Sequence, residues 1–238
     1  MKIGIIQSRG IGDIVIALPI AQFYIDRGDE VYWPIDSRFL SHFHKSFPDI
    51  NFIEIDVNVF KENSLEYFYG IPFEILKGIK CEEIFTLYSY LSDTQIQNVR
   101  LSESLTFDAY KYAISKVPFK EKWNLNPVRN QSREVEIYKK IDLDPSSEYI
   151  IIHNEGSNFK ADFTPLIMNS NLKVVEIKPL TDCIFDWLSV IEGAKMGIFV
   201  DSVYANVIEQ LKIDIPKILY LRSVTKFTPV FINNWIYK

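Results

Sequence analysis

Apolar residues near the amino terminus form short runs that alternate with a segment of helical periodicity. Residues 2–7 and 30–34 are apolar runs of the kind found in strands that are buried on both faces. Between them, apolar residues recur from Ile14 to Ile25 at the spacing of one helix face. This order predicts a βαβ unit with parallel strands and a right-handed crossover.

The predicted helix has a proline inside it and a glycine after it. Pro19 either kinks one long helix, or a short first turn ends and Pro19 opens the main helix at its first position. Gly28 follows Arg27 at the place of a C-terminal cap.

The rest of the chain divides into two series of predicted elements. In the first series we expect strands at 51–57 and 83–87, a helix at 104–116, a connector at 120–130 and a charged helix at 132–141. In the second series we expect strands at 149–153, 172–177, 196–200 and 215–221, helices at 185–194 and 203–211, and a polar loop at 154–163. These series predict an α/β protein with two Rossmann-like lobes, an N-terminal lobe of residues 1–130 and a C-terminal lobe of residues 131–238.

Composition and charge favour a soluble globular protein over nucleic-acid-binding and membrane-spanning classes. The 238 residues are 47% hydrophobic and 24% charged, as in a soluble globular protein. The net charge of −5 and scattered basic residues do not favour nucleic acid as a partner. Cys81 and Cys183 have no metal-ligand spacing, and no apolar run reaches the roughly 18 residues of a membrane span. We therefore expect a cytoplasmic protein with free thiols.

The loop after the first strand contains the first candidate site. Gly10 and Gly12 allow a ligand to approach the backbone, and the start of the following helix favours anions. The pattern partly matches a dinucleotide fingerprint, with Asp36 near the place of a ribose-binding acid, but Val15 occupies the position of the third glycine. A plain tight turn is the alternative without a ligand.

Residues 10–19, Gly-Ile-Gly-Asp-Ile-Val-Ile-Ala-Leu-Pro, resemble the N-terminal signature of heptosyltransferase-like glycosyltransferases, glycosyltransferase family 9. In that family a Gly-Asp pair precedes an apolar helix that contains a proline. Residues 197–202 resemble the family's strand that ends in Asp-Thr or Asp-Ser, and residues 153–160 resemble its Gly-Ser…Lys loop. Where the family has Gly and His after the Asp-Thr pair, this chain has Val203 and Asn206.

The resemblance implies a GT-B-like fold, in which the two Rossmann-like lobes face a cleft and the C-terminal lobe is shortened. It also implies an inverting, metal-independent transfer of a sugar from a nucleotide-sugar donor. The N-terminal lobe holds the acceptor, which is a glycan or another hydroxyl compound, a modified nucleic-acid base included. The C-terminal lobe holds the donor, which is a substrate, so no cofactor is expected. Asp13 takes the role of catalytic base, with an N-cap of the following helix as the alternative.

The resemblance also implies residues that bind the donor. Ser157 and Lys160 contact the diphosphate or are solvated loop residues. Ser202 and the amides after it hold phosphate at a helix start, or Ser202 is an ordinary N-cap, and Asp201 fixes that turn or binds the donor. Glu176 binds a ribose.

Two further basic or titratable side chains have open roles. Arg9, beside Gly10 and Gly12, pairs with a phosphate or an acidic acceptor, or is a surface arginine. His153 is more often a structural histidine than a catalyst in such a position. No residues are predicted to bind a metal.

Two alternative functions stay open at this point. A noncatalytic nucleotide- or sugar-binding protein on the same scaffold is compatible with Val203, Asn206 and the shortened donor lobe. A Rossmann-type NAD(P)-dependent oxidoreductase is compatible with the glycine-rich loop and Asp36.

Overall fold

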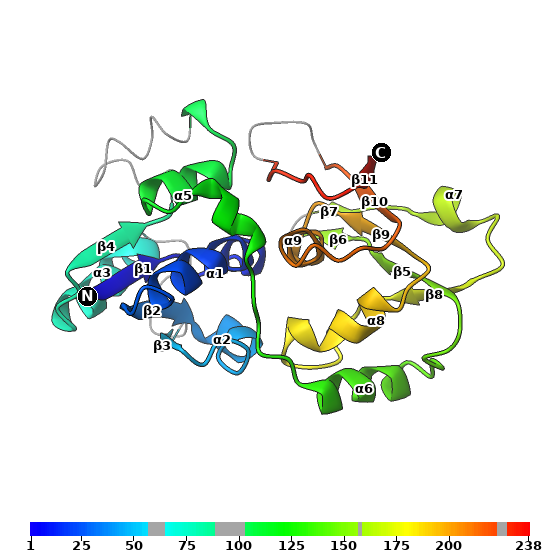
Figure 1. Ribbon diagram of the computed structural model, residues 1–238, viewed down its shortest axis with the longest axis horizontal. Helices are drawn as coiled ribbons and strands as arrows, with labels where there is room; N and C mark the ends of the chain where they lie inside the picture. Colours follow the sequence, from blue (N-terminus) through cyan, green and yellow to red (C-terminus); the bar gives the residue numbers. More distant parts are fainter. Residues whose placement is uncertain (57–64, 89–102, 157–158, 223–227) are drawn as a thin grey trace. The chain divides into compact units, whose positions relative to one another are not determined.

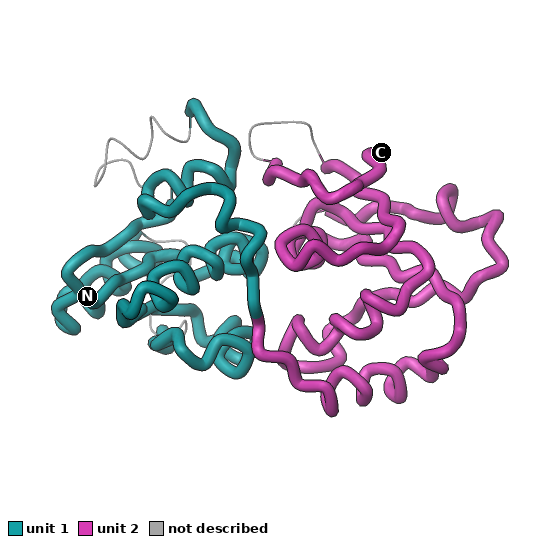
Figure 2. The backbone as a smooth tube through the Cα atoms, viewed as in Figure 1, with its two compact units in different colours: residues 1–126 teal, residues 127–238 magenta. Residues whose placement is uncertain are grey.

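A computed structural model describes residues 1–56, 65–88, 103–156, 159–222 and 228–238. The described chain forms two compact units, residues 1–126 (unit 1) and residues 127–238 (unit 2), coloured separately in Figure 2. The division falls just before residue 130, where the sequence analysis places the boundary. Each unit has its own parallel sheet and its own core, and each is described by itself.

The sheet of unit 1 has four parallel strands in the order β3-β2-β1-β4. They are β1 (Lys2–Ile6), β2 (Glu30–Asp36), β3 (Ile50–Ile55) and β4 (Glu83–Thr86). The predicted βαβ unit is confirmed, because β1 pairs in parallel with β2 and helix α1 (Ile11–Ile25) joins them (Figure 1).

Helix α1 is one continuous helix that contains Pro19 in its interior. Residues 14–18, 20 and 21 of α1 are at most 1% exposed, so the helix is apolar on all sides and buried. The alternative in which Pro19 opens the main helix is therefore wrong. Tyr112 from the later helix α5 (Ala109–Ile114) donates its hydroxyl to the Ile16 carbonyl oxygen at 2.9 Å and holds the middle of α1.

The described residues of unit 1 also contain the helices α2 (Ser37–Phe43), the π-helix η2 (Glu66–Gly70), α3 (Ile71–Gly78), α5 (Ala109–Ile114) and the 3₁₀ helix η3 (Phe119–Trp123). Helix α3 packs closely on the sheet at Gly4, where an added Cβ would lie 2.8 Å from Leu76. Helix α5 is shorter than the helix predicted at 104–116, because Asp108 accepts a hydrogen bond from the Ala109 amide and starts the helix there.

The sheet of unit 2 has five parallel strands in the order β11-β10-β9-β5-β8. They are β5 (Tyr149–His153), β8 (Lys173–Glu176), β9 (Met196–Val200), β10 (Lys217–Tyr220) and β11 (Trp235–Tyr237), the last of which the sequence analysis does not predict. The helices are α6 (Gln131–Lys140), the 3₁₀ helix η4 (Ile184–Trp187), α8 (Leu188–Glu192) and α9 (Val203–Gln210). The helix predicted at 185–194 is thus divided into η4 and α8.

Ion pairs fasten α6 to the elements beside it. Glu134, 1% exposed, accepts from Arg129 and from the Ser189 amide, and Arg129 also reaches Glu192 at 2.7 Å. Burial would raise the pKa of Glu134, but these hydrogen bonds outweigh it and hold the pKa below its ordinary value. The carboxylate therefore stays charged and ties α6 to α8.

The connection from β5 to β8 contains a small hairpin where the sequence analysis expects a polar loop. Strands β6 (Glu155–Gly156) and β7 (Phe159–Lys160) pair antiparallel, and α7 (Thr164–Ile167) is a single turn of four residues. This segment covers one face of the sheet, where Ala161 and Phe163 pack with Ile150 and Ile152 in the core. No helix of the described residues has the length and apolar character that a membrane crossing requires.

Candidate functional site

The strand orders place two loops where open α/β sheets bind ligands. Such sheets bind ligands outside the carboxyl ends of the strands, at the point where the strand order reverses. In unit 1 this switch point lies between β1 and β4, and in unit 2 it lies between β5 and β9. The loop before α1 and the loop before α9 therefore start at the two switch points.

Asp13 lies in the first turn of α1, against the glycine that precedes the helix. Gly10 is the N-cap residue, with a φ of +83°, and no side chain caps the helix. The interpretation of Asp13 as N-cap is wrong, because Asp13 is the third helical residue. A Cβ on Gly10 would lie 2.7 Å from Asp13 Oδ2, so the carboxylate occupies the space that the glycine leaves. Gly12 is the second helical residue, and Asp13 is half-buried.

Buried side chains hold the backbone before Asp13. The Arg9 amide donates to the Tyr88 hydroxyl at 3.1 Å, and Gln7 Nε2 donates to the Arg9 carbonyl oxygen at 2.9 Å. The Arg9 guanidinium lies over the rings of Tyr67 and Phe68, 5.9 and 5.4 Å from their centroids. Arg9 is thus packed on aromatic rings beside the loop and not extended into solvent, and its predicted contact with a phosphate or an acidic acceptor stays a prediction.

Asp36 has a structural role that the dinucleotide interpretation does not foresee. Its carboxylate is 0% exposed, accepts from the Tyr67 hydroxyl, and forms an ion pair with Arg38 at 2.7 Å. Burial would raise the pKa of Asp36, but the hydrogen bonds from Arg38 and Tyr67 outweigh it and lower the pKa. A carboxylate committed to these partners leaves no place for the ribose of a dinucleotide.

At the switch point of unit 2, His153 and Ser202 form a hydrogen bond. His153 Nδ1 lies 3.0 Å from Ser202 Oγ, and the imidazole packs against the Tyr204 ring at 4.8 Å between centroids. Burial lowers the pKa of His153 from 6.5 to about 4, so the imidazole is neutral at neutral pH. Ser202 stands at the N-cap position of α9, but its hydroxyl bonds His153 and does not cap the helix.

The residues around Ser202 are fixed by further polar contacts. Asp201, 4% exposed, accepts from Arg222 Nε at 2.7 Å. Asn206, at the place of the family's histidine, donates from Nδ2 to the Ser202 carbonyl oxygen at 2.9 Å, while its buried Oδ1 has no hydrogen-bond partner among the described residues. Asp201 is therefore a residue that shapes the loop through Arg222, and its predicted contact with the donor stays a prediction.

Two other predicted donor residues lie on the hairpin after β5 and at the end of β8. Lys160, on β7, forms an ion pair with Glu155 across the hairpin at 2.6 Å, and this contact raises the pKa of Lys160. Glu176 ends β8, is half-buried and pairs with Lys178 at 3.4 Å. Ser157 lies outside the described residues.

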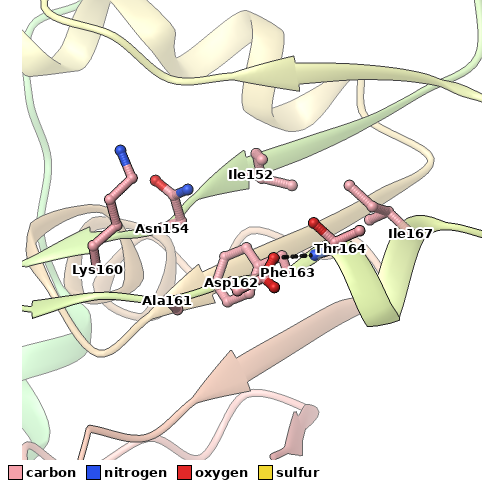
Figure 3. Close-up of a pocket in the computed structure, with 8 residues that line it drawn as sticks. All are labelled: Ile152, Asn154, Lys160, Ala161, Asp162, Phe163, Thr164 and Ile167. Carbon is pink, nitrogen blue, oxygen red and sulfur yellow. Dashed lines mark hydrogen bonds between the residues drawn. The ribbon is translucent and has the colours of Figure 1, made fainter.

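An open cavity of about 420 Å³ lies beside the hairpin (Figure 3). Its polar lining comes from Asn154, Lys160, Asp162 and Thr164, and its apolar lining comes from Ile152, Ala161, Phe163 and Ile167. Asp162 Oδ1 accepts from the Thr164 amide at 2.9 Å, the bond that is dashed in Figure 3. Lys160 is thus the predicted donor residue that borders a cavity of ligand size.

Sequence reasoning misses several residues that build these sites. Gln7 ends an apolar run, and a polar residue at that place is a weak sequence signal for a buried, hydrogen-bonded amide. In the structure Gln7 is 0% exposed. Lys111 and Arg222 are distant in the sequence from the residues that they contact, Gln7 and Asp201, and no local pattern identifies them. In the part of the chain that the structure covers, no group of three or more His, Cys, Asp or Glu is arranged to hold a metal ion.

Comparisons with known proteins add the family context of this fold. No family model matches the chain, and no curated protein matches its sequence. Among solved structures, the glycosyl transferase family 9 protein from Veillonella parvula DSM 2008 is 12% identical, with a TM-score of 0.62, over 100% of this chain and 86% of that chain.

Two structures from E. coli are similar in the same way. The ADP-heptose LPS heptosyltransferase II is 9% identical, with a TM-score of 0.58, over 100% of this chain and 90% of that chain. Heptosyltransferase WaaC with ADP is 11% identical, with a TM-score of 0.55, over 100% of this chain and 92% of that chain. The chain shares their fold. The expected heptosyltransferase-like fold is thereby confirmed, and at such low identity the likeness concerns the fold alone.

Proposed function

We propose that the protein is a glycosyltransferase that moves a sugar from a nucleotide sugar to a hydroxyl acceptor, with inversion and without a metal. Asp13 accepts the proton of the acceptor hydroxyl, whose oxygen attacks the anomeric carbon of the donor. The bond between this carbon and the diphosphate oxygen breaks, and a nucleoside diphosphate leaves. The cytoplasmic setting and the glycan nature of the acceptor stay predictions from the sequence.

Unit 2 contains the groups proposed to bind the donor. The start of α9 and Ser202 suit the phosphates, because helix amides and the helix dipole favour negative charge. Lys160 adds a cation, and the neutral His153 orients the Ser202 hydroxyl. Charge on the leaving diphosphate develops beside these groups, which is where fixed donors lower an activation barrier.

One observation carries the proposal. A half-buried carboxylate, Asp13, lies in the first turn of a helix at a switch point of a fold that this chain shares with glycosyltransferases over its whole length. WaaC is described with ADP, which makes ADP the first nucleotide to test.

Binding and turnover together test the proposal against its alternatives. Isothermal titration with ADP, UDP and GDP, and with sugars linked to them, reports the donor, while release of nucleoside diphosphate reports turnover. Binding without turnover with any acceptor tried favours the noncatalytic alternative. Tight binding of NAD(P) with a change in its absorbance favours the oxidoreductase.

The variant Asp13→Asn tests the catalytic base. We expect turnover to fall by about 100-fold or more, because a positioned base contributes that much and an amide accepts no proton. Donor affinity and the melting temperature should change little, since asparagine has nearly the same shape. Asp26→Asn, at the C-cap of the same helix, is the matched control and should keep full turnover. An Asp13→Asn protein with unchanged turnover would exclude this role.

A further inference from the structure

The ammonium group of Lys111, on α5, is buried where the two strands at the switch point of unit 1 end. Lys111 is 1% exposed, and its Nζ donates to Gln7 Oε1 at 2.8 Å and to the Leu87 carbonyl oxygen at 3.0 Å. The rings of Phe107 and Tyr110 lie beside it, at 4.7 and 5.2 Å from Nζ to the centroids. Gln7 follows β1 and Leu87 follows β4, so Lys111 bridges the strand ends on both sides of the switch point.

The contact with Lys111 determines which way the Gln7 amide faces. An ammonium group only donates hydrogen bonds, so it selects the orientation in which the amide oxygen of Gln7 points toward it. The other end of the amide, Nε2, then faces the Arg9 carbonyl oxygen and donates to it at 2.9 Å. In the reversed orientation, two oxygen atoms would oppose each other at Arg9, and the Lys111 ammonium would face an NH₂ group.

The peptide held by Gln7 is the one that leads into the candidate base. The Arg9 carbonyl belongs to the peptide bond between Arg9 and Gly10, and Gly10 has the positive φ of +83° that turns the chain into α1. The Asp13 carboxylate lies against Gly10, with Oδ2 2.7 Å from the position of a Cβ there. A shift of the Arg9–Gly10 peptide therefore moves Gly10, against which the Asp13 carboxylate packs.

Stability alone is a poor explanation for a lysine at this place. A second buried lysine of unit 1, Lys122, forms an ion pair with Asp108, both 0% exposed. The hydrogen bonds of Lys111, in contrast, go to the neutral oxygens of Gln7 and Leu87. Burying a cation among neutral groups costs free energy that an apolar side chain of the same length would not cost.

We propose that Lys111 and Gln7 are positioning residues that hold the Arg9–Gly10 turn and thereby orient Asp13. Lys111 determines which way the Gln7 amide faces, and the Gln7 amide in turn fixes the position of the Arg9–Gly10 peptide. The inference rests on the proposed function only for the role of Asp13 as base. The hold on the turn itself is a property of the fold and is measured independently of any reaction.

The variant Gln7→Glu separates this role from general stability. Glutamate keeps an acceptor for Lys111 and makes it an ion pair, but it has no hydrogen-bond donor for the Arg9 carbonyl. We expect the melting temperature to be kept or raised, and amide hydrogen exchange in residues 8–14 to become about tenfold faster. Turnover should fall by about tenfold, with the donor KM unchanged, because a misplaced base lowers the rate and not donor binding.

The variant Lys111→Met has a matched control in the same chain. Lys217, 2% exposed at the start of β10, donates to the carbonyl oxygens of Ile213 and Ile215 and lies over the Trp235 ring. Both methionine variants remove a buried ammonium that is bonded to neutral oxygens. We expect only Lys111→Met to loosen residues 8–14 and to lower kcat, while Lys217→Met leaves both unchanged.

The outcomes distinguish this inference from the proposed function. If the wild-type protein turns over no nucleotide sugar, the proposed function fails, and the exchange data still decide whether Lys111 and Gln7 hold the turn. Unchanged exchange in Gln7→Glu overturns the inference, whether or not the protein is active. Faster exchange in residues 8–14 with unaltered kcat also overturns it, because Asp13 would then not depend on the turn.

Discussion

At the residue scale, the protonation state of His153 follows from its position at the end of a strand. His153 is the last residue of β5, next to the start of α9, so its imidazole is enclosed between Ser202 and the Tyr204 ring. A histidine in water has a pKa near 6.5, and burial here lowers the pKa to about 4. The hydrogen bond to Ser202 is thus made by a neutral ring throughout the neutral pH range.

This shifted pKa makes stability depend on pH. Between pH 6.5 and 4 the unfolded state binds a proton at His153 that the folded state does not bind, so stability is complete above pH 6.5 and falls as the pH decreases toward 4. We expect His153→Gln to remove about 1–3 kcal/mol of this pH-dependent change in the free energy of unfolding. Urea unfolding of both proteins between pH 4 and 7.5 measures the difference, in which the titration of other groups cancels. Parallel curves would contradict the buried, neutral state of His153.

At the element scale, the two ends of α1 place similar demands on the backbone but have different surroundings. Gly10 before the helix and Gly28 after it have φ values of +83° and +84°. A Cβ at Gly28 has no atom within 4 Å, whereas a Cβ at Gly10 would lie 2.7 Å from Asp13 Oδ2. The sequence identifies both glycines, but only the packing shows that one of them makes room for a functional side chain.

A pair of alanine variants measures this difference. Gly28→Ala should cost about 1–2 kcal/mol of stability, because an L-residue is strained at positive φ, and should leave turnover unchanged. Gly10→Ala carries the same strain and also displaces the Asp13 carboxylate, so we expect it to lower turnover by about tenfold or more. Chemical denaturation and release of nucleoside diphosphate are the two measurements. Equal turnover in the two variants would show that the contact between Gly10 and Asp13 has no functional effect.

Several elements differ from the prediction, each for a physical reason of its own. Side chains end or start helices at places that apolar spacing does not reveal, as Asp108 does at the start of α5. Between Ile152 and Lys173 the chain is too short for a full crossover helix, and the hairpin β6–β7 and the single turn α7 cover the sheet instead. Strand β11 (Trp235–Tyr237) is apolar but has only three residues, against five in β5 and in β9, which is too short a run to indicate a strand by itself.

At the scale of the whole molecule, each of the two units contains one parallel sheet, and the two sheets differ in strand order. The order β3-β2-β1-β4 and the order β11-β10-β9-β5-β8 each contain one switch point, so each unit has one edge suited to a ligand. All the predicted donor residues, namely Ser157, Lys160, Glu176, Asp201 and Ser202, belong to unit 2. Asp13 and the turn that holds it belong to unit 1.

This division predicts that donor binding is a property of unit 2. Residues 127–238 have their own sheet and buried core, so we expect the isolated segment to fold and to bind the donor nucleotide with an affinity within about tenfold of the whole chain. Isothermal titration measures the affinity, and circular dichroism verifies folding. A folded segment without affinity for a nucleotide that the whole chain binds would show that unit 1 contributes to the donor site.

The sequence alone determined strands β1–β5 and β8–β10, the helix α1, the βαβ start and the position of the glycine-rich loop. Each of these depends on apolar periodicity or on a residue's own backbone preference, and both are local properties of the chain. The resemblance of residues 10–19 to glycosyltransferase family 9 also identified the fold, since the motif combines a Gly-Asp pair, here in the first turn of α1, with Pro19 inside the same helix.

Only the tertiary structure decided which polar side chains meet. Lys111 reaches Gln7 across 104 residues of sequence, and His153 reaches Ser202 across 49. These contacts depend on the order of strands in each sheet, which brings the end of β1 beside that of β4 and the end of β5 beside that of β9. The pattern of residues within one segment does not predict such a contact, because these hydrogen-bond partners come together through the packing of elements that are distant along the sequence.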